Sequence, residues 1–569
     1  MAQQSSAAKT VQLFVIPLLF YFACFYLLTF PQLHQFSTHY FTDEGDGLGN
    51  IWNLWWTNKA ITELHQSPWH TTFLYYPYGT SLLSHTLNPF NGLLAIVLLR
   101  LMTQVQAHNF IVVFAFVVSG VTAFFLAREF TKSFAACLIA GFIFTFSEYH
   151  FSHAQGHLNL LSMEWIPLFV LCWYRLITRP RVVTGVLAGG VLFLVLLCDY
   201  YYFLYCVLIG LLMFIWQWTR SRDWVFFLRS KYPRALGAFL LTALLTSGPL
   251  VISLLLLLVR DPPSGAHDPA DFSLDLLGIV IPGRQWRFAE LTSFFWNGLN
   301  DTVEKSVHIG FAVLCVLVYV WIKRKKLHEA VGLWLLIFVV FALLALGPTL
   351  HIGGHEVRFP LMPYTVVAKV IPGMSLGGMP VRMISMAILA ASVLAAIGFA
   401  ALLRRERRST VVVSILLLVL VFEYLPGPLP ARENPLPDFV RELQKLPDGA
   451  IYDVRSSKFH ALYYQTVHQR PMAYGYIARV ARSVDAKSTD LRRVFETGDY
   501  ARLYSEYGFR YLILPRDMNV VAALGAPLYQ DNDAQIYDLS NSVRRALAQN
   551  SGWRLDRVST GSGSDLVKP

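Results

Sequence analysis

Charged residues are scarce in this sequence: they make up 15% of the 569 residues, while hydrophobic residues make up 55%. A soluble domain needs a larger polar share to cover its surface, so this composition excludes an ordinary soluble protein. The net charge of +11 does not indicate nucleic acid, because the basic residues lie in short clusters between apolar runs. We therefore expect lipid to surround most of the chain, and we expect no nucleic-acid partner.

Cysteine pairs and familiar catalytic motifs are also missing. All six cysteines lie inside apolar stretches without CxxC or Cys/His spacing, so the sequence predicts neither a disulfide framework nor a zinc site. The chain has no P-loop, HExxH or GxSxG motif, which argues against the soluble enzyme classes that carry them.

Long apolar runs are what the sequence does contain. A helix needs about 20 apolar residues to cross the hydrocarbon core, and the run 11–30 meets that length. No small-residue cleavage site follows it, so we expect an uncleaved anchor with a cytoplasmic N-terminus. Further runs bring the prediction to about eleven spans, at 109–126, 134–149, 158–177, 182–198, 200–216, 235–259, 307–322, 330–346, 383–403 and 411–425. The run 90–102 is expected to be re-entrant or to lie on the membrane surface.

The basic clusters orient these helices. If the run 90–102 is not counted as a span, every cluster falls in a cytoplasmic loop, as the positive-inside rule requires in a cell (inner or plasma) membrane. The opposite, extracytoplasmic face then receives a long first loop at 31–108. It also receives the tail, which a proline-rich linker separates from the last helix.

The expected fold is therefore mainly α, a polytopic helical bundle with a small C-terminal α/β domain. We place the membrane domain at 1–425 and the soluble extracytoplasmic domain at 426–569. In the tail, 438–446 is typical of a helix, and 450–454, 511–514 and 535–538 are typical of strands. The final Gly-Ser-Gly-Ser run is expected to be disordered.

An acidic, glycine-rich turn opens the first loop. Asp43, Glu44 and Asp46 follow the first helix directly, in the sequence Thr-Asp-Glu-Gly-Asp-Gly, where glycines permit close approach of a ligand to the backbone. Carboxylates at this place can act as a base or hold a cation. The amphipathic stretch 51–61 follows, and its tryptophans are expected to lie at headgroup level, as an aromatic belt or as a substrate platform.

Other polar residues are predicted to meet on the same face. Ionisable groups at membrane depth are costly, so each is a candidate for substrate binding; they are His85, His153, His157, Glu164, Asp199 and Arg382. Arg382 precedes an apolar run, and its guanidinium could pair with a lipid phosphate. Each candidate also has a structural alternative: Arg382 as an interfacial anchor, Glu164 as a helix cap, and the histidines as satisfied core residues.

Several of these motifs together resemble bacterial members of the C-type (GT-C) superfamily of membrane glycosyltransferases. They are the early Asp followed by Asn-x-Trp-x-Leu-Trp-Trp-like residues at 50–56, the Tyr-Pro-Tyr-Gly stretch at 76–79, the Gly-His-Leu-Asn turn at 156–159, and a soluble region after the last helix. The resemblance covers the membrane portion well and the tail weakly.

The resemblance implies a polyprenyl-phosphate-linked sugar as donor, an acceptor of unknown identity at the outer face, and inversion at the anomeric carbon. Asp46 would be the catalytic base, with Glu44 beside it in substrate binding. The departing phosphate would need Arg382 or a carboxylate-held divalent cation. No cofactor is required by the sequence, and histidines at 153 and 157 stand where the superfamily has a second acidic motif, which argues against strict metal dependence.

Two other functions remain open at this level. In a non-enzymatic transporter or flippase, Asp46, Asp199 and the histidines would line a substrate path or a proton relay. The chain shows no paired halves of the kind that transporters often have. A catalytically inactive scaffold is the third possibility, and the intact acidic turn argues against it.

Overall fold

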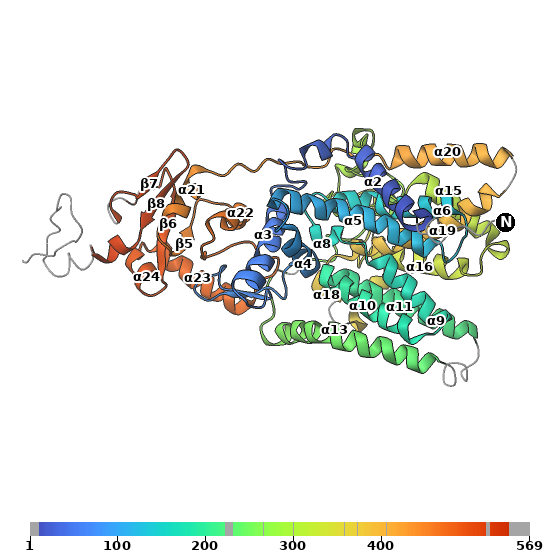
Figure 1. Cartoon of the computed structure of the whole chain (residues 1–569), viewed down its shortest axis with the longest axis horizontal. Helices are drawn as coiled ribbons and strands as arrows, with labels where there is room; N and C mark the ends of the chain where they lie inside the picture. Colours follow the sequence, from blue (N-terminus) through green and yellow to red (C-terminus); the bar gives the residue numbers. More distant parts are fainter. Residues whose placement is uncertain are drawn as a thin grey trace, which may run out of the picture. The chain divides into compact units, whose positions relative to one another are not determined.

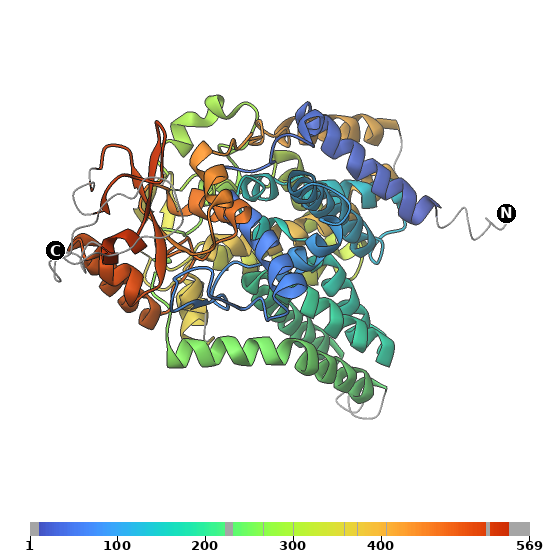
Figure 2. The same cartoon turned by 60° about the vertical axis from the view of Figure 1, so that its left-hand side comes forward.

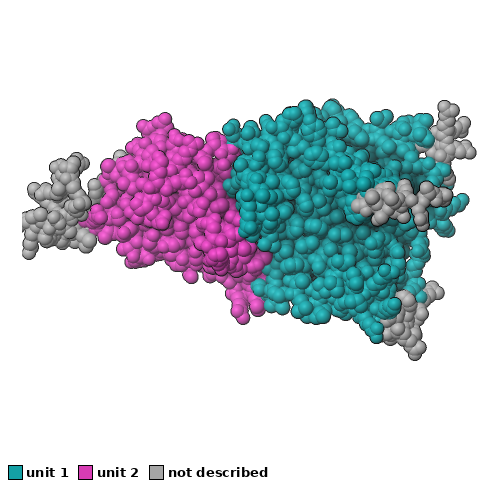
Figure 3. Space-filling model, in the orientation of Figure 1, with its two compact units in different colours: residues 1–43, 88–253, 266–433 teal, residues 44–87, 254–265, 434–569 magenta. Residues whose placement is uncertain are grey.

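The computed structural model describes residues 11–221, 231–265, 267–299, 301–357, 359–371, 374–404, 407–518, 520 and 524–544. Contacts divide the chain into two compact units, which Figure 3 distinguishes by colour. The first unit contains residues 1–43, 88–253 and 266–433, and the second contains residues 44–87, 254–265 and 434–569. The final Gly-Ser-Gly-Ser run lies outside the described residues.

The first unit is helical (Figure 1). Its helices of eight or more residues are α2 (Ile16–Leu28), α4 (Pro89–Leu98), α5 (Gln104–Ala127), α6 (Phe134–Thr145), α9 (Ile166–Thr178), α10 (Val182–Cys198), α11 (Tyr200–Ser221), α13 (Tyr232–Arg260, which ends in the second unit), α15 (Phe311–Lys323), α16 (Val331–Ala345), α17 (Pro363–Val370), α19 (Ile384–Leu403) and α20 (Arg407–Glu423). Shorter elements are α7 (Glu148–His153), α8 (Leu158–Leu161), α14 (Ser293–Trp296), α18 (Met374–Gly377) and the hairpin β3 (Leu350–Ile352) with β4 (His355–Val357).

Membrane-spanning helices are present, as the apolar runs predicted. Among the described residues, five helices are long and apolar enough to cross a bilayer: Val11–Leu28, Gln104–Ala127, Tyr200–Ser221, Tyr232–Arg260 and Pro380–Leu403. Six more apolar helices of 10–17 residues accompany them. The chain is thus a multi-pass membrane protein, while the total of eleven spans stays a prediction. At 10 residues, α4 is too short to cross by itself, which agrees with a re-entrant or surface segment.

Small residues let the helices of the first unit pack closely. Tyr21 of α2 enters a gap that Gly120 of α5 and Gly141 of α6 leave open, and a Cβ on either glycine would lie within 2.6 Å of the Tyr21 side chain. The Tyr21 hydroxyl donates to the carbonyl of Leu138 at 3.0 Å. Such contacts hold helices together in lipid, where the hydrophobic effect does not distinguish a neighbouring helix from an acyl chain.

The helix α13 is the long green helix of Figure 2. It lies against α10, since a Cβ on Gly185 would meet the backbone carbonyl of Ala235, and one on Gly189 would meet the side chain of Thr242. Its remaining faces are exposed apolar surface, as expected of a helix that faces lipid.

The second unit combines a small sheet with helices from two distant parts of the sequence. Its elements are α3 (Asp46–Asn58), the hairpin β1 (His70–Thr71) with β2 (Thr80–Ser81), α21 (Asp438–Lys445), β5 (Ala450–Asp453), α22 (Lys458–His468), α23 (Arg482–Glu496), α24 (Tyr500–Ser505), β6 (Phe509–Pro515), β7 (Tyr529–Gln530) and β8 (Ala534–Asp538). The sheet order is β5-β6-β8-β7, with β5 parallel to β6 and the other pairs antiparallel. In register, Leu512 of β6 lies opposite Tyr452 and Tyr537.

The local elements predicted in the tail are confirmed. The helix at 438–446 and the three strands appear as α21, β5, β6 and β8 with nearly the expected bounds. The predicted domain boundary at residue 425 stays a prediction, because contacts rather than chain order define the two units, and residues 44–87 are grouped with the tail.

The tryptophans of the first loop do not form a headgroup belt, so that expectation is wrong. Trp52 and Trp56 are fully buried inside the second unit, with their rings stacked at 5.7 Å. The Trp52 indole donates to Gln465 of α22 at 2.6 Å. An amphipathic stretch has the same sequence pattern whether its apolar side faces lipid or protein, and here α22 covers it.

Candidate active site

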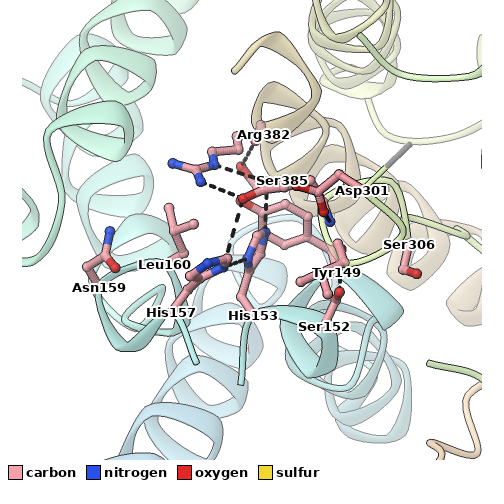
Figure 4. A network of polar contacts seen from close by, with 12 residues as sticks. Tyr149, Ser152, His153, His157, Asn159, Leu160, Asp301, Ser306, Arg382 and Ser385 are labelled. Atoms are coloured by element: carbon pink, nitrogen blue, oxygen red, sulfur yellow. Dashed lines mark hydrogen bonds and ion pairs between the residues drawn. The ribbon is translucent and has the colours of Figure 1, made fainter. Parts of the chain in front are cut away.

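Four polar residues far apart in the sequence meet in the first unit. His153 ends α7, and His157 follows after a three-residue turn, directly before the first residue of α8. Arg382 lies in the 3-10 turn Pro380–Met383 that leads into α19, and Glu304 lies in the loop before α15. We call His153, His157, Glu304 and Arg382 the HHER cluster. Figure 4 shows Arg382 facing the two imidazoles.

The centre of the HHER cluster is a bidentate ion pair. Arg382 donates from Nε to Glu304 Oε2 at 3.1 Å and from Nη2 to Glu304 Oε1 at 2.5 Å. Both side chains are nearly excluded from solvent. Paired guanidinium and carboxylate geometry of this kind is directional, so the pair fixes the orientation of both planes.

The histidines approach the same carboxylate from the other side. His153 Nε2 lies 3.7 Å from Glu304 Oε2, and His157 Nδ1 lies 3.8 Å from Glu304 Oε1. The two Nδ1 atoms share a hydrogen bond of 3.0 Å. His153 is fully buried, whereas the His157 side chain is 24% exposed. His157 is thus the member of the pair that a ligand can reach.

The electrostatics of the cluster follow from this geometry. Burial alone would raise the pKa of Glu304, but the Arg382 guanidinium and the histidines outweigh it, and the pKa lies well below its usual range. For His153, burial lowers the pKa well below its ordinary value, and the negative Glu304 does not compensate. At neutral pH the cluster therefore contains an ionised carboxylate, a guanidinium and a neutral imidazole.

Tyr201 connects the cluster to an apolar pocket. The Arg382 guanidinium lies 4.9 Å from the centre of the Tyr201 ring, and the Tyr201 hydroxyl donates to the carbonyl of Gly377 at 2.9 Å. The same tyrosine lines a pocket together with Leu204, Tyr205, Tyr364, Met374, Met379, Pro380 and Met383. Tyr201 thus lies between a cation and an apolar pocket, an arrangement that suits an amphiphilic ligand with an anionic head.

The cluster also offers ligands for a divalent cation. One atom each of His153, His157 and Glu304 lies within 4.8 Å of the others. Among the described residues, no group forms a hydrogen bond with the buried His153 Nε2 atom, so this nitrogen is available to bind a metal ion. Two imidazoles and a carboxylate are a common set for Zn²⁺. A bound cation would have to share Glu304 with Arg382.

Asp43 lies against the turn that joins the two histidines. Its backbone N–H donates to the carbonyl of Gln155 at 2.6 Å, and the Thr42 hydroxyl donates to the same oxygen at 3.0 Å. A Cβ on Gly156 would lie 2.6 Å from Asp43 Oδ2. The carboxylate of Asp43 thus occupies space that only a glycine at position 156 leaves open.

Asp199 and Glu164 belong to the same unit. Asp199 Oδ1 accepts the backbone N–H groups of Tyr201 and Tyr202 at the start of α11, and Oδ2 accepts from Asn159 at 2.7 Å. This is the geometry of a helix cap. The Asp199 carboxylate also interacts electrostatically with Arg382 of the HHER cluster. Glu164 is fully buried.

The remaining predicted residues belong to the second unit. Asp46 is the first residue of α3, and Glu44 is exposed just before it. His85 is buried, which lowers its pKa to about 4 in spite of the nearby Asp46 charge. Its Nδ1 accepts from the Ala478 N–H at 3.1 Å and its Nε2 contacts Asn53 Oδ1 at 3.0 Å, so the ring is neutral with its proton on Nε2. Both nitrogens are engaged, as in a structural histidine.

Sequence reasoning brought three of the four HHER residues to one face and missed Glu304. Glu304 has no motif around it and stands in a mixed polar stretch between two apolar runs. Asp43 was named only as a neighbour of Asp46. The available signal for Asp43 was its position directly after the first helix.

Among solved structures, the chain is similar to mycobacterial arabinofuranosyltransferase AftD, with a TM-score of 0.54 and 13% identity over 92% of this chain and 41% of AftD. It also matches the oligosaccharyltransferase AglB of Archaeoglobus fulgidus, with a TM-score of 0.46 and 12% identity over 90% of this chain and 70% of AglB. ArnT of Cupriavidus metallidurans matches with a TM-score of 0.45 and 12% identity over 95% of this chain and 99% of ArnT. The protein has a GT-C-like membrane glycosyltransferase fold.

The particular family follows from the sequence. The chain belongs to the family described as "Domain of unknown function (DUF6311)", whose model matches residues 18–424. No curated protein matches the chain.

Proposed function

We propose that this protein is an integral membrane glycosyltransferase that moves a sugar from a polyprenyl-phosphate donor to an acceptor hydroxyl at the extracytoplasmic face of the cell membrane. The observation that carries the proposal is Tyr201, which contacts the Arg382 guanidinium and also lines an apolar pocket. A polyprenyl phosphate has the matching chemistry, an anionic head on an apolar chain. The GT-C-like fold supports the same reaction class.

In the proposed reaction a carboxylate of the first loop takes the proton of the acceptor hydroxyl. The acceptor oxygen forms a bond to the anomeric carbon, the bond from that carbon to the phosphate oxygen breaks, and polyprenyl phosphate leaves with the electron pair. Attack on the face opposite the phosphate inverts the anomeric centre. Arg382 would stabilise the charge on the departing phosphate, because Glu304 accepts only two of the five N–H groups that a guanidinium offers.

For the base, the sequence favours Asp46, whereas the geometry of the first unit favours Asp43. The Asp43 carboxylate lies against Gly156, directly beside His157 of the HHER cluster. The backbone N–H of Asp43 donates to the carbonyl of Gln155, so the residue that carries the carboxylate is fixed in position, as a catalytic base must be. We therefore propose Asp43 as the base and keep Asp46 as the competing assignment.

The remaining predicted roles follow the same scheme. His157, with its partly exposed ring, would bind donor or acceptor, and His153 would orient it. Asp199, Glu164 and His85 would support the surrounding structure and take no part in the chemistry. The N-terminus would lie in the cytoplasm and the tail outside.

The test is turnover by purified protein in lipid nanodiscs, with radiolabelled polyprenyl-phosphate sugars and envelope extracts as acceptors. Release of polyprenyl phosphate should be lost in Asp43→Asn and retained in the matched control Asp271→Asn, which makes the same change at an exposed carboxylate of the first unit. Loss in Asp46→Asn with retention in Asp43→Asn would return the base to Asp46. No release from any donor, even by the wild type, would contradict the enzyme and favour a transporter or flippase.

A further inference from the structure

The loop between α13 and α15 contains a segment, Trp286–Trp296, that carries several exposed apolar side chains although it lies outside the membrane-spanning helices. Two short helical turns form it, the 3-10 turn Ala289–Thr292 and α14. Phe288, Leu291 and Phe294 are 38%, 69% and 78% exposed. A water-facing loop rarely presents three large apolar residues so close together.

Hydrogen bonds and an aromatic contact hold the Trp286–Trp296 segment against the end of α20. The Trp286 indole donates to the carbonyl of Phe422 at 3.0 Å, and the Arg287 N–H donates to the carbonyl of Leu425 at 2.8 Å. The rings of Phe288 and Phe422 stack with their centres 5.3 Å apart. Phe288 is therefore held beside Phe422 at the end of α20.

The exposed face of α20 continues into the segment. Ile415, Leu418 and Phe422 are 55%, 71% and 46% exposed along this apolar helix, as lipid-facing residues are. The helix ends at Glu423, one residue after Phe422. Since Phe288 stacks on Phe422, the exposed apolar surface of α20 extends onto Phe288.

The charges around the segment suit the same level. Arg284 and Arg287 are exposed beside it, and cations at the edge of an apolar surface pair with lipid phosphates. A lipid surface thus satisfies both the apolar and the cationic part of this patch.

We propose that the Trp286–Trp296 segment lies in the membrane interface, with Phe288, Leu291 and Phe294 among the upper acyl chains of the phospholipids. The two ends of the loop are joined, because the Arg284 N–H donates to the Ser306 hydroxyl at 3.2 Å. Glu304 lies in the second half of this loop, where its backbone N–H donates to Asp301 Oδ1 at 3.1 Å. Insertion of the segment thereby fixes Glu304 at the height of the lipid headgroups.

Depth-resolved fluorescence quenching tests this proposal. A fluorescent non-canonical amino acid replaces Phe294 in the otherwise native chain, reconstituted in phosphatidylglycerol/phosphatidylethanolamine nanodiscs. The label should lose most of its emission with nitroxide-labelled lipids and little with aqueous iodide. The same label at Arg493, an exposed residue of α23, provides the control for a water-facing position and should respond mainly to iodide.

The result that overturns the proposal is a label at position 294 that iodide quenches as strongly as it does at position 493. Protection from both quenchers would also overturn it, because the segment would then be covered by protein. To show that the native side chains drive insertion, the label is measured again in a chain carrying Phe288→Asp and Leu291→Asp. There it should change from lipid-quenched to iodide-quenched, while the thermal midpoint of the protein stays near that of the singly labelled chain.

Discussion

The carboxylate of Asp43 occupies the space in which a side chain on Gly156 would begin, 2.6 Å from an ideal Cβ at that position. Gly156 lies in the turn that joins His153 to His157, so this contact connects the segment that follows α2 to the HHER cluster. The two residues are more than a hundred positions apart in the sequence. A change in the conformation of the turn should therefore move the Asp43 carboxylate, and a change at Asp43 should disturb the turn.

Substitution Gly156→Ala should displace the Asp43 carboxylate, because a methyl group and the carboxylate cannot occupy the same space. A shift of about 1 Å in a reacting group can cost roughly a hundredfold in rate, so we expect turnover to fall by about that factor. Release of polyprenyl phosphate measures it. Gly237→Ala in α13 is the control, since, among the described residues and apart from the backbone of its own helix, no atom lies within 4 Å of its added Cβ. Equal turnover in the two variants would contradict a role for this contact.

Glu304→Gln should destabilise the protein more than removal of the whole ion pair. A guanidinium left buried without its carboxylate costs about 3–5 kcal/mol, whereas replacing both partners with apolar groups is nearly neutral. We expect a clearly lowered thermal midpoint in Glu304→Gln and a smaller change in the double variant Glu304→Leu, Arg382→Met. Midpoints are measured in detergent under one set of conditions. The prediction fails if the double variant is the less stable of the two.

A divalent metal should bind at the HHER cluster, with His157 as the accessible ligand. After equilibration with Zn²⁺ and desalting, His157→Ala should retain at least about tenfold less metal than the wild type, since one of three ligands is lost. Arg382→Gln should retain more, because the guanidinium no longer competes for Glu304. Metal is measured by plasma mass spectrometry, with His85→Ala as the control that removes a buried histidine of the other unit. Equal metal in all variants would contradict the site.

The membrane helices and the elements of the tail were predictable because their signals are local. An apolar run of about 20 residues predicts a span, and the short apolar run at 511–514, bounded by Pro515, indicates a buried strand. The prediction for the tryptophans was wrong because their environment depends on a distant segment of the chain. Trp52 and Trp56 belong to a pattern that fits a lipid surface as well as a protein core, and only the position of α22, some four hundred residues later, decides between them.

By itself, the sequence determined that this is a multi-pass membrane protein, which residues are costly enough at membrane depth to be functional candidates, and where the strands of the tail lie. The tertiary structure decided that Arg382 pairs with Glu304 across 78 residues, and that Asp43 lies against Gly156. It also decided that His85 is fully engaged in structure. The physical reason is that the length and the periodicity of an apolar run depend only on residues that are neighbours in the sequence. The partner of a buried charge depends instead on which distant segments the packed helices bring together.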